Sequence, residues 1–142
     1  MTFIIAEIGV NHNNNLEYSK KLIDFCASQK IDAVKFQTFK AENLAQKYTP
    51  KVLYQKNNKD DNENHFDMLK KLELSKKDHF ILKKYFEKKK IEFISTPYDV
   101  ESAKFLISLK LKTIKVASAD LTDFFLHDLH SKTKKKIILS TG

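Results

Sequence analysis

The chain has 142 residues, of which 42% are hydrophobic, 11% aromatic and 31% charged, which fits one globular domain and excludes a disordered or fibrous protein. One cysteine, two glycines and two prolines exclude a disulfide framework, a turn-rich all-β sandwich and a glycine-rich phosphate loop. No apolar run approaches the ~18 residues of a membrane-spanning helix, and the first residues carry no basic leader. We therefore expect a soluble, cytoplasmic protein without a membrane partner.

Lysine dominates the charge of the protein. Lys and Arg total 26 against 18 Asp and Glu, a formal net charge of +8, and the sequence contains no arginine. The lysine runs 88–90 and 134–136 stand directly before apolar stretches, where we expect helices to end and their dipoles to favour cations. Nucleic-acid binding is the weaker interpretation, because arginine and interleaved exposed aromatic residues are missing. We therefore expect no nucleic-acid partner.

The first part of the chain predicts a strand, a helix and a second strand. The apolar run 3–10 has the length of a strand, and the polar cluster 11–15 can cap the helix that the spacing of apolar residues predicts over 16–27. Within that helix Cys26 stands among apolar residues, where a thiol packs as a small hydrophobe. Residues 33–39 predict the second strand.

A long polar stretch follows the second strand. Residues 40–64 are too many for an ordinary loop between a strand and a helix. Their acidic run 60–63 lacks the glycine and the spacing of a calcium loop, so we interpret it as a mobile acidic loop. Residues 66–74 then form a short helical pattern, and Ser75 can cap a stronger helix that extends to Phe86.

The remaining elements repeat the alternation of strand and helix. In chain order we expect a strand over 92–96, a turn at 97–99, a helix over 103–109, a strand over 113–118, a brief helix over 124–129 and a strand over 136–141. His127 and His130 are three residues apart on the last helix, but no acidic or thiol partner is spaced to complete a metal site, so we interpret both as surface histidines.

Each predicted strand begins apolar and ends polar. The polar residues at these ends are Glu7, His12, Lys35, Gln37, Ser95, Thr96, Ser118, Asp120, Ser140 and Thr141. In parallel α/β proteins the ligand site lies at the carboxyl ends of the strands. Two architectures fit this pattern, a β/α barrel and an open doubly wound sheet, and the sequence lacks the glycine-rich first turn of a dinucleotide-binding protein.

Lys35 and Lys115 stand in the middle of apolar strands. In a barrel such a lysine points inward, and burial of its charge without a partner is costly. We therefore predict a functional role for both, with surface lysines whose stems lie along the sheet as the alternative.

Several motifs, in order and spread over the chain, resemble one known family. They are IAEIGVNHN at 5–13, AVKFQTF at 33–39, EFISTPYD at 92–99, IKVAS at 114–118 and IILSTG at 137–142. The chain resembles the N-acetylneuraminate (sialic acid) synthase family, which includes the legionaminic and pseudaminic acid synthases.

The resemblance implies a partial TIM (β/α)8 barrel with about five parallel strands and intervening helices. Residues 1–142 would be the N-terminal portion of that barrel, truncated after the fifth strand and without the small antifreeze-like domain that family members commonly carry at the C-terminus. The family condenses phosphoenolpyruvate with the open-chain aldehyde of an N-acetylated amino sugar and releases phosphate. A divalent metal, Mn or Mg, polarises the aldehyde, and its histidine ligands belong to the missing part, so we expect no metal ligand in this chain.

The resemblance also implies roles for individual residues. The phosphoenolpyruvate site would be lined by Lys35, Thr96, Lys115, Ser118 and Ser140, whose ammonium and hydroxyl groups suit a phosphate and a carboxylate. Gln37 would contact the sugar. Asp120, which stands where many members carry a glutamate, and Glu7 would handle protons.

We therefore expect the fragment of a nonulosonic acid synthase that is inactive alone. Its partners would be phosphoenolpyruvate, an N-acetyl amino sugar and a complementary chain or a second copy, because the first and fifth strands are open edges. The alternative is a non-catalytic module that binds phosphoenolpyruvate or another anion, or that serves in assembly.

Overall fold

The computed structural model describes residues 2–51 and 63–142, so residues 60–62 of the predicted acidic loop lie outside it. The strands are β1 (Ile5–Gly9), β2 (Ala33–Thr38), β3 (Glu92–Pro97), β4 (Thr113–Val116) and β5 (Lys136–Leu139). The helices are α1 (Leu16–Ser28), α2 (Ala41–Leu44), α3 (His65–Leu72), α4 (Lys76–Lys89), α5 (Val100–Ser108), the 3-10 turn η2 (Ser118–Asp120) and α6 (Phe124–Ser131). Within the described residues, no helix is long and apolar enough to cross a membrane.

The strands form one sheet in the order β1-β2-β3-β4-β5, and each strand is parallel to its neighbour. A doubly wound sheet reverses its strand order partway across, so that alternative is wrong. The sheet also curves: the Nζ atom of Lys136, at the start of β5, lies 5.1 Å from the ring centroid of Phe3, which precedes β1. The two edge strands therefore approach each other at their amino ends, as in the wall of a barrel.

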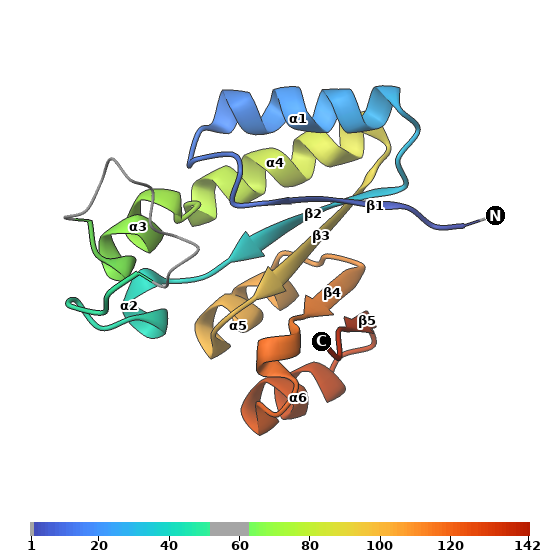
Figure 1. Ribbon diagram of the computed structural model, residues 1–142. Coiled ribbons are helices and arrows are strands. Elements are labelled where there is room, and N and C mark those ends of the chain that lie inside the picture. Colours follow the sequence, from blue (N-terminus) through green and yellow to red (C-terminus); the bar gives the residue numbers. More distant parts are fainter. Residues whose placement is uncertain (1, 52–62) are drawn as a thin grey trace.

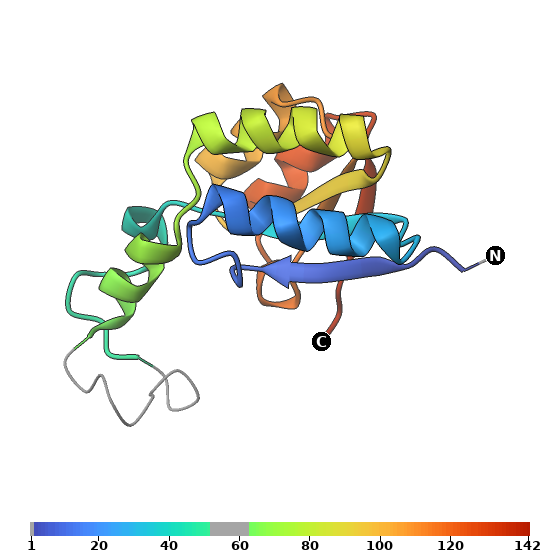
Figure 2. The same ribbon diagram turned by 90° about the horizontal axis from the view of Figure 1, so that it is seen from above.

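The helices cover one face of this sheet. Figures 1 and 2 show α1 and α4 side by side along the β1–β3 part. Beneath them the rings of Phe86 and Phe93 stack with centroids 4.5 Å apart, and Phe36 meets both edge-on. Cys26 is buried in the same core, as expected. Since Phe36 faces the helices, its neighbours Lys35 and Gln37 point to the other face of the sheet, the inner face.

Side-chain caps set the start of most helices. Asn15 accepts a hydrogen bond from the backbone N of Tyr18, and Ser75 accepts one from the backbone N of Asp78, so both predicted caps are confirmed. Helix α5 begins at Val100, three residues before its predicted start at 103, because Asp99 caps it through the backbone N of Ser102.

Other predicted boundaries also differ from the structure. The strand predicted over 3–10 covers only 5–9, and the strand predicted over 136–141 ends at Leu139. The fourth strand ends at Val116 and not at Ser118, because the chain turns there into η2. The polar stretch 40–64 contains the short helix α2, whose 4 residues are too few to show the helical spacing of apolar residues.

A lysine with left-handed backbone follows each of the helices α1, α4 and α5. These residues are Lys30, Lys90 and Lys110, at φ of 57°, 56° and 59°. This conformation crowds the Cβ atom and is usually left to glycine. We expect Lys90→Gly to raise the free energy of unfolding by about 0.5–1 kcal/mol, measured by urea denaturation. The control is Lys84→Gly on the exposed face of α4, which should lower it by about 1 kcal/mol. A loss in both variants would contradict this interpretation of Lys90.

The prediction that His130 is a surface residue is wrong. Its side chain is 1% exposed, and neither ring nitrogen has a hydrogen-bond partner among the described residues. His130 lies on the buried side of α6, and this helix of 8 residues is too short for the spacing of its apolar residues to indicate that side. Burial, with a smaller contribution from His127, lowers the pKa of its imidazole, which keeps the ring neutral.

Because the unpaired nitrogens of His130 are costly, His130→Leu should stabilise the protein by about 1 kcal/mol at pH 7.5 in urea denaturation. His127→Leu is the matched change on the same helix. It removes an Nε2 atom that lies 2.8 Å from the carbonyl oxygen of Leu121 and donates to it, so it should give no gain. Destabilisation by His130→Leu would show that the buried ring has a partner.

Candidate functional site at the carboxyl ends of the strands

Lys35 is the centre of a polar cluster on the inner face of the sheet. Its Nζ atom lies 2.6 Å from Oε2 of Glu7 on β1, the residue that pairs with it in register. The same ammonium donates a hydrogen bond to Thr96 Oγ1 on β3 at 3.1 Å. Its side chain is only 13% exposed, so this charge is held by partners from both neighbouring strands.

Lys115 repeats this arrangement two strands further on. Its Nζ atom donates to Ser140 Oγ, just beyond β5, and to the carbonyl oxygen of Val116, both at 2.5 Å. Burial lowers the pKa of Lys115, the charge of Lys35 acts in the same direction, and Glu7 opposes them. The two ammonium groups and the carboxylate therefore share one electrostatic environment.

The two lysine contacts have the same geometry. Lys35 pairs in register with Ile94 but bonds to Thr96, and Lys115 pairs with Ile138 but bonds to Ser140, so each reaches two residues further along the next strand. This diagonal step follows the stagger of neighbouring strands in a barrel. It brings side chains of four strands to one level of the inner face.

Gly9 leaves room for the side chains of two predicted site residues. Its φ is +57°, and a Cβ atom there would lie 3.0 Å from Oε1 of Glu7 and 3.6 Å from Nε2 of Gln37. Gln37 in turn pairs in register with Thr96. Both side chains therefore lie beside a position where glycine leaves the room that a Cβ atom would take.

Asp120 and Ser118 lie in η2, directly after β4. The Oδ2 atom of Asp120 is buried and has no hydrogen-bond partner among the described residues. Burial raises the pKa of this carboxyl, Asp123 adds to the rise and His127 opposes it. Ser118 is exposed at the start of η2. The structure shows contacts for Glu7, Lys35, Thr96, Lys115 and Ser140. Among the described residues it shows no hydrogen bond of the Ser118 hydroxyl.

Tyr98 was not among the predicted site residues. Burial raises the pKa of its phenol, and the charges of Asp120 and Glu7 add to this rise, so the ring stands in the field of both carboxylates. Its backbone N–H donates to the carbonyl oxygen of Thr38 at the end of β2. The sequence predicts Tyr98 as part of the turn at 97–99. The only sequence feature that indicates a place near the site is its position two residues after Thr96.

This cluster has the chemistry of an anion site. Two ammonium groups and adjacent hydroxyls can donate charge-assisted hydrogen bonds to the oxygens of a small dianion. A metal site is a different matter: within residues 2–51 and 63–142 no group of three His, Cys, Asp or Glu side chains could hold an ion. The residues present do not fit a metal, and we assign none of them to one.

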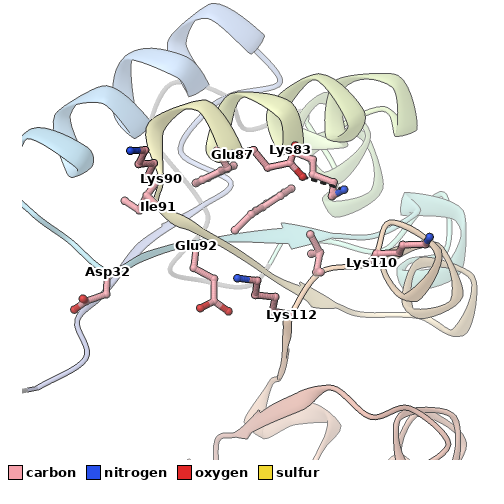
Figure 3. Close-up of a pocket in the computed structure, with 11 residues that line it drawn as sticks. Asp32, Lys83, Glu87, Lys90, Ile91, Glu92, Lys110 and Lys112 are labelled. Carbon is pink, nitrogen blue, oxygen red and sulfur yellow. Dashed lines mark ion pairs between the residues drawn. The ribbon is translucent and has the colours of Figure 1, made fainter.

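A separate cleft lies at the opposite end of the sheet (Figure 3). It encloses about 500 Å³ near the amino ends of β3 and β4, and its lining includes Phe86, Phe93 and Leu111. Both acidic and basic side chains line it, and an ion pair of 3.1 Å joins Lys83 and Glu87. None of the predicted site residues lines this cleft.

Comparison with known proteins gives a consistent result. The family model described as the NeuB family matches residues 22–142. The N,N'-diacetyllegionaminic acid synthase of Legionella pneumophila is 46% identical over 141 residues, which cover 99% of this chain and 39% of that protein. The human N-acetylneuraminate-9-phosphate synthase is 30% identical over 146 residues, with 99% of this chain and 39% of that protein covered.

A solved structure shows the same fold. The N-acetylneuraminic acid synthetase of Leptospira borgpetersenii, in complex with citrate, superposes with a TM-score of 0.81 at 31% identity and covers 99% of this chain and 44% of its own. The predicted partial barrel is therefore confirmed. This chain spans about two fifths of the length of the curated relatives it matches.

Proposed function

Because this chain belongs to the NeuB family, we propose that its inner-face cluster binds phosphoenolpyruvate as part of a sialic-type acid synthase. The observation that carries this proposal is the pair Lys35 and Lys115, each inward-facing and each bonded to a hydroxyl of the next strand. Phosphoenolpyruvate has a phosphate and a carboxylate, so two separated ammonium groups match its two charged ends. The hydroxyls of Thr96, Ser118 and Ser140 would orient the same oxygens.

The proposed reaction joins the methylene carbon of phosphoenolpyruvate to the aldehyde carbon of an N-acetyl amino sugar. The aldehyde oxygen gains a proton, a water oxygen adds to the former enol carbon, and phosphate leaves. Asp120 is suited to take the proton of that water, because a carboxylate with a raised pKa is a stronger base. Glu7 would exchange protons on the other side of the cluster, and Gln37 would hold the sugar.

Manganese or magnesium would polarise the aldehyde in this family. We place its ligands outside the described residues, and none of the roles proposed above depends on it.

The proposed macromolecular partner is a polypeptide that supplies further β/α units. The edge strand β5 leaves Ile137 and Leu139 exposed at 41% and 46%, although both are of a type that a barrel wall buries. Strand β1 is the other edge of the sheet. Open edges with apolar residues favour association with another chain.

Titration of phosphoenolpyruvate into this chain tests the binding proposal by calorimetry, and absence of binding would contradict it. Catalysis is tested with the Legionella relative's remaining segment as the complementary polypeptide, manganese, and N-acetylmannosamine or a bacillosamine-type sugar. Phosphate release that requires both chains supports the synthase. Binding of phosphoenolpyruvate without turnover in the assembled pair would favour the alternative, a non-catalytic binding module.

A further inference from the structure

A chain of buried polar groups links helix α4 to the ends of β2 and β3. Thr38 Oγ1 lies 2.8 Å from His79 Nε2 and 2.7 Å from Ser95 Oγ. The other ring nitrogen of His79, Nδ1, lies 2.8 Å from the carbonyl oxygen of Ser75. Thr38, His79 and Ser95 are 5%, 1% and 0% exposed, so solvent does not compete for these bonds.

The direction of each hydrogen bond follows from the acceptor at one end. A carbonyl oxygen only accepts, so Nδ1 of His79 carries the ring proton and donates to Ser75. Burial lowers the pKa of His79, which leaves the ring neutral and makes Nε2 an acceptor. The Thr38 hydroxyl must then donate to Nε2, and the Ser95 hydroxyl donates to Thr38.

These groups lie directly behind the proposed phosphoenolpyruvate pocket. Thr38 follows Gln37 in β2, and Ser95 precedes Thr96 in β3; Gln37 and Thr96 pair in register. Side chains alternate along a strand, so the buried hydroxyls face α4 while Gln37 and Thr96 face the inner side. Thr96 in turn accepts a hydrogen bond from Lys35. The hydrogen bonds between His79, Thr38 and Ser95 therefore hold β2 and β3 near their carboxyl ends, where the pairing of the two strands stops.

We propose that His79 is a positioning residue for this site: through Thr38 and Ser95 it fixes the ends of β2 and β3, and with them Gln37 and Thr96. The proposal deepens the proposed function, because it assigns a role to a side chain that touches no substrate. Helix α4 is held on the sheet by its apolar face as well, so loss of the imidazole should loosen the two strand ends without releasing the helix.

The test compares three variants of this chain by phosphoenolpyruvate titration and by nuclear magnetic resonance of the Gln37 and Thr96 amides. His79→Leu removes the acceptor of the Thr38 hydroxyl and should weaken binding by about three- to thirtyfold, the range typical of residues coupled to a site. His79→Gln, which keeps a polar atom near the place of Nε2, should restore affinity to within about threefold. Tyr85→Phe is the matched control on α4, because it removes the hydrogen bonds to Asp24 of α1 and leaves the sheet side intact.

The expected result is a shift of the Gln37 and Thr96 resonances in His79→Leu but not in Tyr85→Phe. A folded His79→Leu with unchanged resonances and affinity would overturn the proposal, as would a wild-type ring that carries its proton on Nε2. If His79→Leu does not fold, Thr38→Val carries the same expectations. If wild type does not bind phosphoenolpyruvate, the proposed function fails, while the resonances of Gln37 and Thr96 still decide whether His79 positions them.

Discussion

Simultaneous exchange of Lys35 and Lys115 for methionine is expected to weaken phosphoenolpyruvate binding by at least about 100-fold. A charge-assisted hydrogen bond is worth about 1.5–3 kcal/mol, and about 1.4 kcal/mol corresponds to a tenfold change in affinity. Methionine keeps most of the length of each side chain, so the inner face stays filled while both charges are lost. Isothermal titration calorimetry of the wild type, the two single variants and the double variant measures the effect.

The control for this exchange is Lys112→Met. Lys112 lies beside the cleft at the opposite end of the sheet, away from the inner-face cluster. Its exchange removes one positive charge, as each single variant does. We expect its affinity to stay within about twofold of wild type at physiological salt, where distant surface charges are screened. An equal loss in Lys112→Met and Lys115→Met would show that overall charge, and not the inner cluster, attracts the ligand.

Acidification is expected to remove about 3 kcal/mol of stability through His12 alone. Burial is the main cause that lowers the pKa of His12 from 6.5 to about 4, and the charge that His79 would carry if protonated acts in the same direction. Between these two pH values the His12 imidazole is protonated in the unfolded chain but not in the folded chain. The contribution of His12 to the stability of the fold is therefore complete above pH 6.5 and is lost as pH falls toward 4. Each unit of pKa shift corresponds to about 1.4 kcal/mol. His79 and His130 have lowered pKa values and act in the same direction.

Urea denaturation at several pH values between 7.5 and 4.5 measures this loss. His12→Asn is the informative variant, because an asparagine oxygen can replace the Nδ1 atom that accepts from the backbone N of Asn14. It should reduce the slope of stability against pH below 6 by up to about 1.4 kcal/mol per unit, since one titrating group is removed. The same slope in both proteins would show that His12 titrates normally in the fold.

The order and type of the elements follow from the sequence, because their signals are local. Apolar runs such as 33–39 and capping residues such as Asn15 and Ser75 act within one strand or one turn. The inward direction of Lys35 can also be predicted. Its sequence neighbours are apolar and take the face covered by helices, and side chains alternate along a strand, so Lys35 points to the other face. The contacts of Lys35 with Glu7 and Thr96 come from residues 28 and 61 positions away, and no local pattern encodes them.

The features that escape sequence reasoning depend on tertiary packing. His130 stands on a short helix whose buried side is decided by contacts between α5 and α6. Tyr98 stands in the field of Asp120, which follows β4, and of Glu7 on β1, and both lie far from it in the sequence. In the sequence His79 is one polar residue of a lysine-rich helix. The residues of its hydrogen-bond chain, Thr38 and Ser95, lie on two different strands, so no local pattern indicates them. The left-handed Lys90 is hidden because glycine, the usual marker of that position, is absent there.

The most direct test of the proposed anion site follows the ammonium nitrogens of individual lysines by nuclear magnetic resonance while phosphoenolpyruvate is added to the protein. We expect the signals of Lys35 and Lys115 to shift together and to saturate with one equivalent, while that of Lys112 stays in place. Shifts spread evenly over the surface lysines, or inner lysines that do not respond to a ligand that binds, would contradict it.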